Sequence, residues 1–171
     1  MQPEDNTHTV GKGMVILAWI CGLGLITWVF SGLLEAQFNP NQSPESRRSG
    51  EQIEVILEQN RAGHYVATGS INRVPVVFLI DTGATDVSIP AHLASTLNLT
   101  AGRPALARTA NGTVRIAETT LDRIAVGDIE LQNVDANLNP GMQGDHILLG
   151  MSFLKQLEFT QRGNALILRS L

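Results

Sequence analysis

The pattern of hydrophobic and polar positions divides the chain into an apolar N-terminal run and a longer region of short alternating segments. Residues 13–34 contain no charged side chain, and a run of this length can cross a bilayer as a helix. A cleaved signal peptide usually has a shorter apolar run, of about 7–15 residues. A helix that is apolar on every face seldom fits inside a small soluble domain. We therefore predict an N-terminal tail over 1–12 and a transmembrane helix over 13–34.

The segment that follows has a different composition. Residues 35–50 are rich in Asn, Ser, Gln and Pro, and they contain few apolar side chains that could dock on a core. Such a composition is typical of a flexible tether. The folded domain is then predicted over 51–171, which is long enough to bury a core unaided.

Within 51–171 the apolar positions recur with a period of two, which is typical of half-buried strands. Residues 53–59 and 64–71 are predicted to pair as a hairpin around the turn 60–63. Later strands are predicted at 74–80, 86–89, 108–116, 121–126, 129–134, 146–150, 157–161 and 165–170. Tight turns are predicted at Asn72-Arg73, Asn111-Gly112, Gly127-Asp128 and 162–164. Many short strands with frequent turns predict a small β-barrel or sandwich.

Helix is predicted at only two places in this region. Pro90 occupies a position suited to the first turn of a short helix that ends near Leu97. The sequence "MSFLKQL", which follows Gly150, indicates one or two helical turns. The domain is therefore expected to be all-β in class.

Composition and charge exclude several functions. The net charge is −4, and the Lys and Arg residues are dispersed, so we expect no nucleic-acid partner. Cys21 is the single cysteine, which excludes an intrachain disulfide and a cysteine zinc site. The four histidines are far apart in the sequence. We therefore expect no metal and no cofactor.

One carboxylate occupies an unusual position. In "PVVFLIDTGATDVSIP", the apolar residues 76–80 lead directly to Asp81, which is followed by Thr82 and Gly83. A carboxylate at the rim of an apolar core is costly unless it is paired or neutralised. Two such carboxylates can hold one proton between them. The ionised carboxylate can then take a proton from water while the protonated one donates to a substrate carbonyl.

That chemistry requires two aspartates, and the chain contains one Asp-Thr-Gly triplet. A two-fold symmetric dimer would supply the second, because a residue near the axis meets its own copy there. The alternative is that Asp81 simply begins a turn in an unrelated β-domain.

Three segments together resemble a known family. "FLIDTGAT" (78–85), "TANG" (109–112) and "ILLGMSFL" (147–154) occur in the order found in retropepsin-like (clan AA) aspartic proteases. The chain is most similar to the bacterial, membrane-anchored, single-lobe members, and the similarity spans about 52–171. The resemblance implies a retropepsin-like acid protease barrel with one lobe per chain, preceded by a transmembrane helix.

The resemblance also implies a role for individual residues. Asp81 would be the catalytic aspartate, and Thr82, Gly83 and Ala84 would form the active-site loop, with Thr82 gripping the loop of the partner subunit. The remaining implied site residues are Ala110, Asn111 and Gly112 at the tip of a substrate-binding flap, and Leu148, Leu149 and Gly150 packed beneath the loop. The C-terminal strand 165–170 would join an intersubunit sheet. Thr85 departs from the retroviral pattern, in which an acid is frequent.

The implied function is an aspartic endopeptidase that acts as a homodimer on a peptide or protein substrate. The alternative within the same fold is a catalytically silent dimerisation or peptide-binding module on the membrane. The resemblance and Lys12 at the N-terminal end of the apolar run favour a single-pass protein of the bacterial inner membrane with a periplasmic protease domain. Arg47 and Arg48, which follow the run, favour the opposite orientation.

Overall fold

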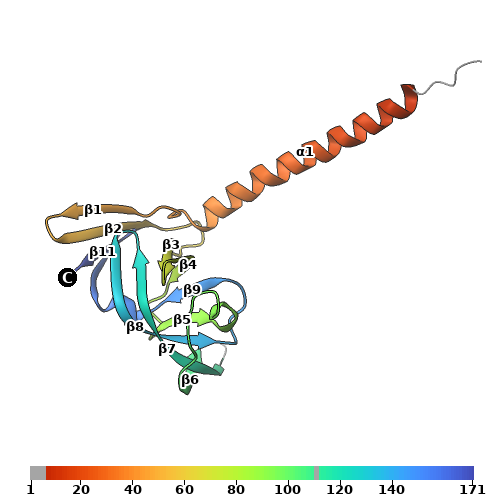
Figure 1. Ribbon diagram of the computed structural model, residues 1–171. Helices are drawn as coiled ribbons and strands as arrows, with labels where there is room; N and C mark the ends of the chain where they lie inside the picture. Colours follow the sequence, from red (N-terminus) through yellow and green to blue (C-terminus); the bar gives the residue numbers. More distant parts are fainter. Residues whose placement is uncertain (1–6, 110–111) are drawn as a thin grey trace, which may run out of the picture. The chain divides into compact units, whose positions relative to one another are not determined.

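The computed structural model describes residues 7–109 and 112–171 (Figure 1). It divides into a helical unit that ends at Gln37 and a β-rich unit, Phe38–Leu171. Helix α1, Thr7–Phe38, contains the predicted transmembrane helix and extends beyond it at both ends. Its segment Lys12–Phe38 is long and apolar enough to cross a membrane. Trp19 and Trp28 of this segment are 69% and 75% exposed.

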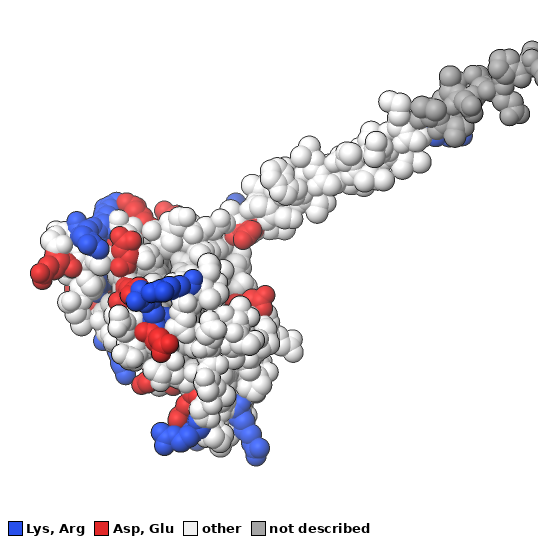
Figure 2. Space-filling view, in the orientation of Figure 1, with Lys and Arg blue, Asp and Glu red and all other residues white. Residues whose placement is uncertain are grey.

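The β-rich unit consists of two sheets. The smaller is antiparallel and has the order β1-β2-β11-β10. Its strands are β1 (Glu45–Ser49), β2 (Gln52–Glu58), β10 (Leu157–Arg162) and β11 (Ala165–Ser170). On the face shown in Figure 2, acidic and basic side chains are interspersed over this unit. That dispersion agrees with the scattered charges of the sequence.

The larger sheet has the order β3-β4-β9-β5-β8-β7-β6, and an additional β3–β7 pairing closes it into a barrel. Its strands are β3 (Val66–Ile71), β4 (Val74–Ile80), β5 (Val87–Pro90), β6 (Pro104–Thr109), β7 (Gly112–Val126), β8 (Ile129–Asn139) and β9 (His146–Leu149). Two short helices, η1 (Ala91–Leu93) and α2 (Met151–Leu154), complete the unit.

One continuous core joins the two sheets. Val55, Leu57 and Leu168 come from the smaller sheet, and Phe78 from the larger, and all are fully buried in the same cluster. Phe153 of α2 is also fully buried there. Each such side chain contributes roughly 1.5–3 kcal/mol by leaving water. The core therefore holds the strand that precedes Asp81 in a fixed position.

Most predicted turns and strands are confirmed. Asn72 and Arg73 form the β3–β4 turn, with φ of 49° and 69°. Gly127-Asp128 connects β7 to β8, and β10 and β11 form the predicted C-terminal hairpin. The strand at 74–80 is β4, and the helical segment after Gly150 is α2. The helix predicted from Pro90 is shorter than expected, because regular helix is limited to η1.

One predicted pairing is wrong. Strands β2 and β3 do not form a hairpin: β2 pairs with β1 and β11, β3 pairs with β4 and β7, and a single bridge, Gln59–Tyr65, joins the two segments. The alternating pattern identified both strands but did not identify their partners. The predicted strand 165–170 is β11. It lies between β2 and β10, so both of its edges are already paired.

The predicted flexible tether also differs in the structure. Within 35–50, α1 continues to Phe38, and β1 pairs along β2. Asn39 and Asn41 are 4% and 5% exposed. Composition suggested a tether because these residues are polar, but their amides are bonded to the core rather than solvated.

Asn41 fills the gap left between β2 and β3. Its Nδ2 donates to the carbonyl oxygens of Val66 and Glu58 at 2.7 and 2.9 Å, and its Oδ1 accepts from the Glu58 N–H at 2.7 Å. The backbone N–H of Thr68 donates to the Asn41 carbonyl at 2.9 Å. One side chain thereby satisfies backbone groups that a missing strand would otherwise satisfy.

Replacing Asn41 with Ala should lower the free energy of unfolding by roughly 2–4 kcal/mol, because it leaves the buried carbonyl of Val66 and the part-buried backbone groups of Glu58 unpaired. Urea unfolding of the full chain in detergent, followed by circular dichroism, measures the change. Gln42→Ala is the matched control, since Gln42 is the exposed neighbour. Equal losses for the two variants would contradict the role of Asn41.

Candidate active site

Asp81 lies directly after β4, at the end of an apolar strand. Strand β4 is an inner strand, with β3 antiparallel on one side and β9 parallel on the other. Ile80 is in register with Leu149, and the N–H of Asp81 donates to the Leu149 carbonyl at 3.1 Å. Asp81 is half-buried. The sheet therefore fixes the backbone of Asp81 while its carboxylate still reaches solvent.

The loop after Asp81 folds back on its side chain. The N–H of Gly83 donates to Asp81 Oδ1 at 2.8 Å, and the N–H of Ala84 donates to the Asp81 carbonyl at 3.2 Å. A Cβ at Gly83 would lie 3.1 Å from Oδ1, which is tight for that contact. This turn orients the carboxylate with a backbone donor. Among the described residues Oδ2 has no hydrogen-bond partner, so it is available to bind water or substrate.

The loop is supported from beneath by the start of α2. The N–H groups of Met151 and Ser152 donate to the carbonyls of Ala84 and Thr85 at 2.8 and 2.9 Å. A Cβ on Gly150 would clash with the Asp86 carbonyl and would lie 2.7 Å from that of Ala84. Only glycine permits this close approach of two backbones. Sequence-predicted Leu148, Leu149 and Gly150 thus lie at the carboxyl end of β9, next to the Asp81 loop.

Ser152 is a supporting residue that sequence analysis missed. Its Oγ accepts the N–H of Val87 at 3.0 Å and donates to the Asp135 carbonyl at 2.7 Å. Ser152 is 3% exposed. The hydroxyl therefore links β5, β8 and α2 behind the loop. The only signal in the sequence was a small polar residue between Met151 and Phe153, which is too common to identify such a role.

The predicted flap is the hairpin of β6 and β7. Thr109 is in register with Gly112, whose φ is 110°, and Thr109 Oγ1 donates to the Gly112 carbonyl at 2.8 Å. The two arms of the predicted hairpin are thus confirmed, but Gly112, which was expected in the turn, is the first residue of β7 and pairs with Thr109. Ala110 and Asn111 lie outside the described residues. Leu106 on β6 is 70% exposed, so the hairpin presents an apolar side chain to solvent.

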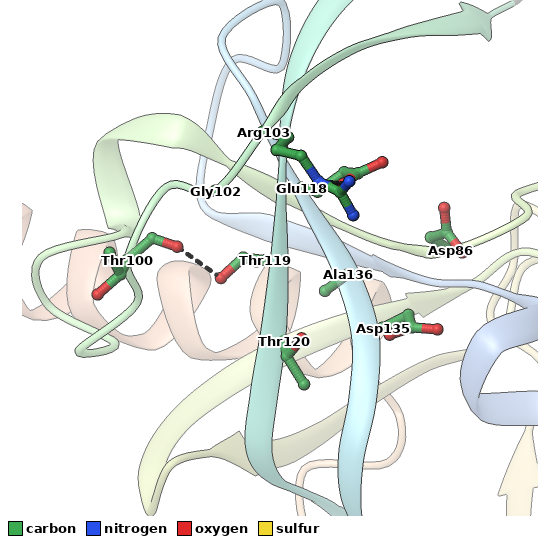
Figure 3. Close-up of a pocket in the computed structure, with 9 residues that line it drawn as sticks. All are labelled: Asp86, Thr100, Gly102, Arg103, Glu118, Thr119, Thr120, Asp135 and Ala136. Atoms are coloured by element: carbon green, nitrogen blue, oxygen red, sulfur yellow. Dashed lines mark hydrogen bonds and ion pairs between the residues drawn. The ribbon is translucent and has the colours of Figure 1, made fainter.

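A polar pocket of about 680 Å³ lies between the far end of the Asp81 loop and the base of this hairpin (Figure 3). It is lined by Asp86, Thr100, Gly102, Arg103, Glu118, Thr119, Thr120, Asp135 and Ala136. Arg103 extends toward Glu118, with Nε and Oε2 3.6 Å apart. Burial and the nearby Asp135 carboxylate raise the pKa of Asp86, and Glu118 adds to the shift, while Lys155 opposes it.

The described residues around Asp81 and the polar pocket do not form a metal-binding cluster. Over the part of the chain that the structure describes, no cluster of three or more His, Cys, Asp or Glu side chains is placed to hold a metal ion. Thr82 is exposed, and its hydroxyl has no partner within the same residues. Asp81, Thr82, Gly83, Ala84 and the β9–α2 junction are brought together, whereas Gly112 belongs to the separate hairpin.

A comparison with protein families identifies the chain. Residues 67–156, just over half of it, match the family described as gag-polyprotein putative aspartyl protease. The chain belongs to this family. The matched range includes β4, the Asp81 loop, the β6–β7 hairpin, β9 and α2. It is thus a retropepsin-like aspartic protease by family, as the resemblance in its sequence indicated.

Two curated relatives and one solved structure extend the match. An uncharacterized protein in the cobV 5′ region of Sinorhizobium sp is 31% identical over 135 residues, covering 77% of this chain and 58% of the relative. An uncharacterized protein of Rickettsia prowazekii (strain Madrid E) is 30% identical over 118 residues, covering 67% and 50%. The chain therefore spans only about half the length of these relatives.

The solved structure is a retropepsin-like aspartic protease from Rickettsia conorii. Its TM-score is 0.58, with 28% identity over 75% of this chain and 94% of that one. This match confirms the predicted fold class, an all-β retropepsin-like fold preceded by an apolar helix that could cross a membrane.

Asp86→Asn should stabilise the retropepsin-like domain slightly at neutral pH. Because the pKa of Asp86 is raised on folding, wild type is relatively most stable below the ordinary aspartate pKa of about 3.9 and loses stability as pH rises through the raised value. Asparagine carries no charge, so the gain should appear at pH 7 and vanish near pH 3. Urea midpoints measured across pH test this.

The control for that experiment is Asp122→Asn, since Asp122 is an exposed carboxylate of β7 outside the polar pocket. It should leave the pH profile unchanged. A pH-independent effect of Asp86→Asn would show that burial and Asp135 do not penalise the Asp86 charge.

Proposed function

We propose that this chain is an aspartic endopeptidase whose active site forms when two copies place their Asp81 carboxylates together. The observation that carries the proposal is the setting of Asp81. Its backbone is fixed by β9, Oδ1 is oriented by the Gly83 N–H, and Oδ2 is open. A module that only binds or dimerises has no need of a carboxylate held in this way.

One copy of the chain supplies one of the two catalytic aspartates that the proposed mechanism requires. Among the described residues no second carboxylate follows an apolar strand within an Asp-Thr-Gly loop, and Asp86 lies at the other end of the same loop. A two-fold axis beside Asp81 would provide the second group from an identical loop. In the proposed site, exposed Thr82 contacts the partner's loop.

The proposed reaction is hydrolysis of a peptide bond by a bound water. The ionised Asp81 takes a proton from the water, whose oxygen attacks the scissile carbonyl carbon, and the protonated Asp81 of the partner subunit donates a proton to the carbonyl oxygen. As the tetrahedral intermediate collapses and its C–N bond breaks, Asp81 passes the proton it took from water to the leaving nitrogen, and a hydroxyl of the intermediate returns a proton to the partner's Asp81. No cofactor takes part.

Other parts of the site hold the substrate. Gly83 and Ala84 present backbone to an extended peptide, and the β6–β7 hairpin closes over it with Ala110, Asn111 and Gly112 at its tip. Leu148, Leu149 and Gly150 keep the loop in place from below. The last of these roles is supported by the backbone hydrogen bonds that join β9 and α2 to the loop.

The same proposal places the enzyme on a membrane. Helix α1 would be a single-pass anchor in the bacterial inner membrane, with the protease domain in the periplasm. Lys12 at its N-terminal end supports a cytoplasmic N-terminus. A signal sequence passes the same test of length and composition. N-terminal sequencing of the mature protein distinguishes the two.

Asp81→Asn should reduce cleavage of a peptide library by about 10³-fold or more while the fold persists, because the amide cannot accept the proton of water. Cleavage by the full chain in detergent is measured from pH 3 to 8, with circular dichroism in parallel. Asp128→Asn, in the exposed β7–β8 turn, serves as the matched control and should retain activity.

Two results would argue against the proposal. If the Asp81→Asn variant still cleaves the peptides, Asp81 is not the catalytic residue. A folded, dimeric wild type without any cleavage would favour the catalytically silent binding module.

Activity per molecule should depend on how densely the chain occupies a membrane, because confinement in one bilayer raises the effective concentration of the two halves. When the full chain is reconstituted in vesicles, diluting the vesicles in buffer should leave the activity unchanged. Diluting the chain tenfold with extra lipid should lower it. Activity that is insensitive to added lipid would contradict a site shared between two chains.

A further inference from the structure

One face of the larger sheet carries Asp81 together with polar side chains of β5 and β8. Ser88 of β5 is in register with Leu148 of β9 and with Asn137 of β8. Leu148 is in turn in register with Leu79 of β4. Residues in register project to the same face of a sheet, as do residues two apart along a strand. Because the N–H of Asp81 continues the hydrogen bonds between β4 and β9, Asp81 points to this same face, which we call the active-site face.

Two buried polar side chains lie side by side on the active-site face. Ser88 and Asn137 are each 7% exposed, and Ser88 Oγ donates to Asn137 Oδ1 at 2.8 Å. Asn137 Nδ2 has no hydrogen-bond partner among the described residues. We propose that this pair is a specificity subsite of the protease, and that it binds the side-chain carboxamide of a Gln or Asn residue in the substrate. The inference rests on the proposed function and names the substrate class that the site selects.

The Asn137 amide is placed to bind a further group. Its nitrogen carries two N–H donors, and it is unfavourable to bury such donors unpaired. Of the fully enclosed side-chain nitrogen and oxygen atoms in the described residues, only the Tyr65 hydroxyl lacks a hydrogen-bond partner. Asn137 Nδ2 is therefore not fully enclosed, and an acceptor on the active-site face can reach it.

No backbone group of the described residues depends on the pair. The Ser88 hydroxyl contacts only the Asn137 amide and, at 3.3 Å, the Met142 sulfur. Asn139, which is also on β8 and 6% exposed, is different, because its Oδ1 accepts the Gly141 N–H at 2.8 Å and so holds a turn. Two apolar side chains in place of Ser88 and Asn137 would cost the fold little. A ligand explains the polarity of the pair, whereas folding does not require it.

Carboxylates beside the pair determine which kind of ligand fits. Asp86 and Asp135 lie on the active-site face, because each precedes a member of the pair by two residues. Glu118 is in register with Asn137. All three acids line the polar pocket (Figure 3), and of the three only Glu118 forms an ion pair with a described residue, Arg103. A substrate carboxylate would therefore be repelled.

A carboxamide matches both the free donor and the acids. Its oxygen can accept from Asn137 Nδ2, and its NH₂ group can donate to the carboxylate of Asp135. Two residues along a strand are about 6.6 Å apart, a span that one amide with a hydrogen bond at each end can bridge. A Lys or Arg side chain offers no acceptor to Asn137, and an aliphatic side chain leaves all of these groups unpaired.

Met142, in the connection between β8 and β9, covers the pair. Its sulfur lies 3.3 Å from Ser88 Oγ, and its side chain is half-buried. Methionine is unbranched and adapts to different neighbours. It can therefore shift to admit a substrate side chain without any movement of the sheet.

A positional-scanning peptide library tests the substrate class. Binding is measured with the full chain carrying Asp81→Asn in detergent, and cleavage with wild type. Both should select Gln or Asn at one position of the peptide. At that position, replacing Gln with Leu or Glu should weaken binding and lower kcat/KM by about tenfold or more, because Leu leaves the subsite unpaired and Glu adds a like charge. Binding is compared at pH 7, where a substrate Glu is ionised.

Substitutions at Asn137 test which residue makes the selection. Asn137→Leu removes the donor and should reduce the preference for Gln over Leu by about tenfold. Asn137→Asp keeps the size but replaces the donor with a carboxylate, and it should shift the selection from Gln to Lys or Arg. Gln132→Leu removes an exposed amide from the same strand, so it is the matched control and should leave the preference unchanged. If Asn137→Leu does not fold, Asn137→Asp and the wild-type library decide the question.

The outcomes separate this inference from the proposed function. Asp81-dependent cleavage without a preference for Gln or Asn at any position would overturn the subsite and leave the protease assignment intact. A preference that survives both Asn137 substitutions would do the same. Selective binding of Gln peptides that Asn137→Leu abolishes, without cleavage by wild type, would support the subsite and count against the protease assignment. Absence of both binding and cleavage would overturn both.

Discussion

The structure depends on a close backbone contact between the Asp81 loop and the β9–α2 junction. The Asp81 N–H donates a hydrogen bond to the Leu149 carbonyl. The first N–H groups of α2 donate to the carbonyls of Ala84 and Thr85. Gly150 makes this approach possible, because any side chain there would strike the loop. The apolar core under β4 and β9 holds both partners rigidly. The catalytic carboxylate proposed here is thus oriented by main chain, which a point substitution elsewhere on the surface cannot easily disturb.

The local features of the fold could be predicted from the sequence because each has a local cause. The apolar run of β4, the two-residue turns and the apolar N-terminal helix each depend on residues that are neighbours in the chain. The resemblance carried by "FLIDTGAT" and "ILLGMSFL" then indicated that two distant segments meet at one site. Of the predicted site residues, only Ala110 and Asn111 fall outside the described part of the chain.

Pairing between distant segments could not be predicted in the same way. Alternation shows that 53–59 and 64–71 are strands, but it does not show that they enter different sheets. The role of Asn41 was hidden for a related reason. A polar side chain in a Pro- and Ser-rich segment has the composition of a solvated tether, and only the positions of Glu58 and Val66 reveal that it is buried and bonded. Ser152 is comparable, since its hydroxyl joins strands far from it in sequence.

The contact at Gly150 also bears on timing during synthesis. Chains grow from the N-terminus at roughly 5–20 residues per second, so Asp81 is made seconds before the residues that hold its loop. The helix that could enter a membrane is made before the β-rich unit, and α2 is made well after β4. A nascent chain therefore carries the Asp81 carboxylate without its supporting contacts until the residues of the β9–α2 junction have been made. The order of elements along the chain thus delays formation of the site during synthesis.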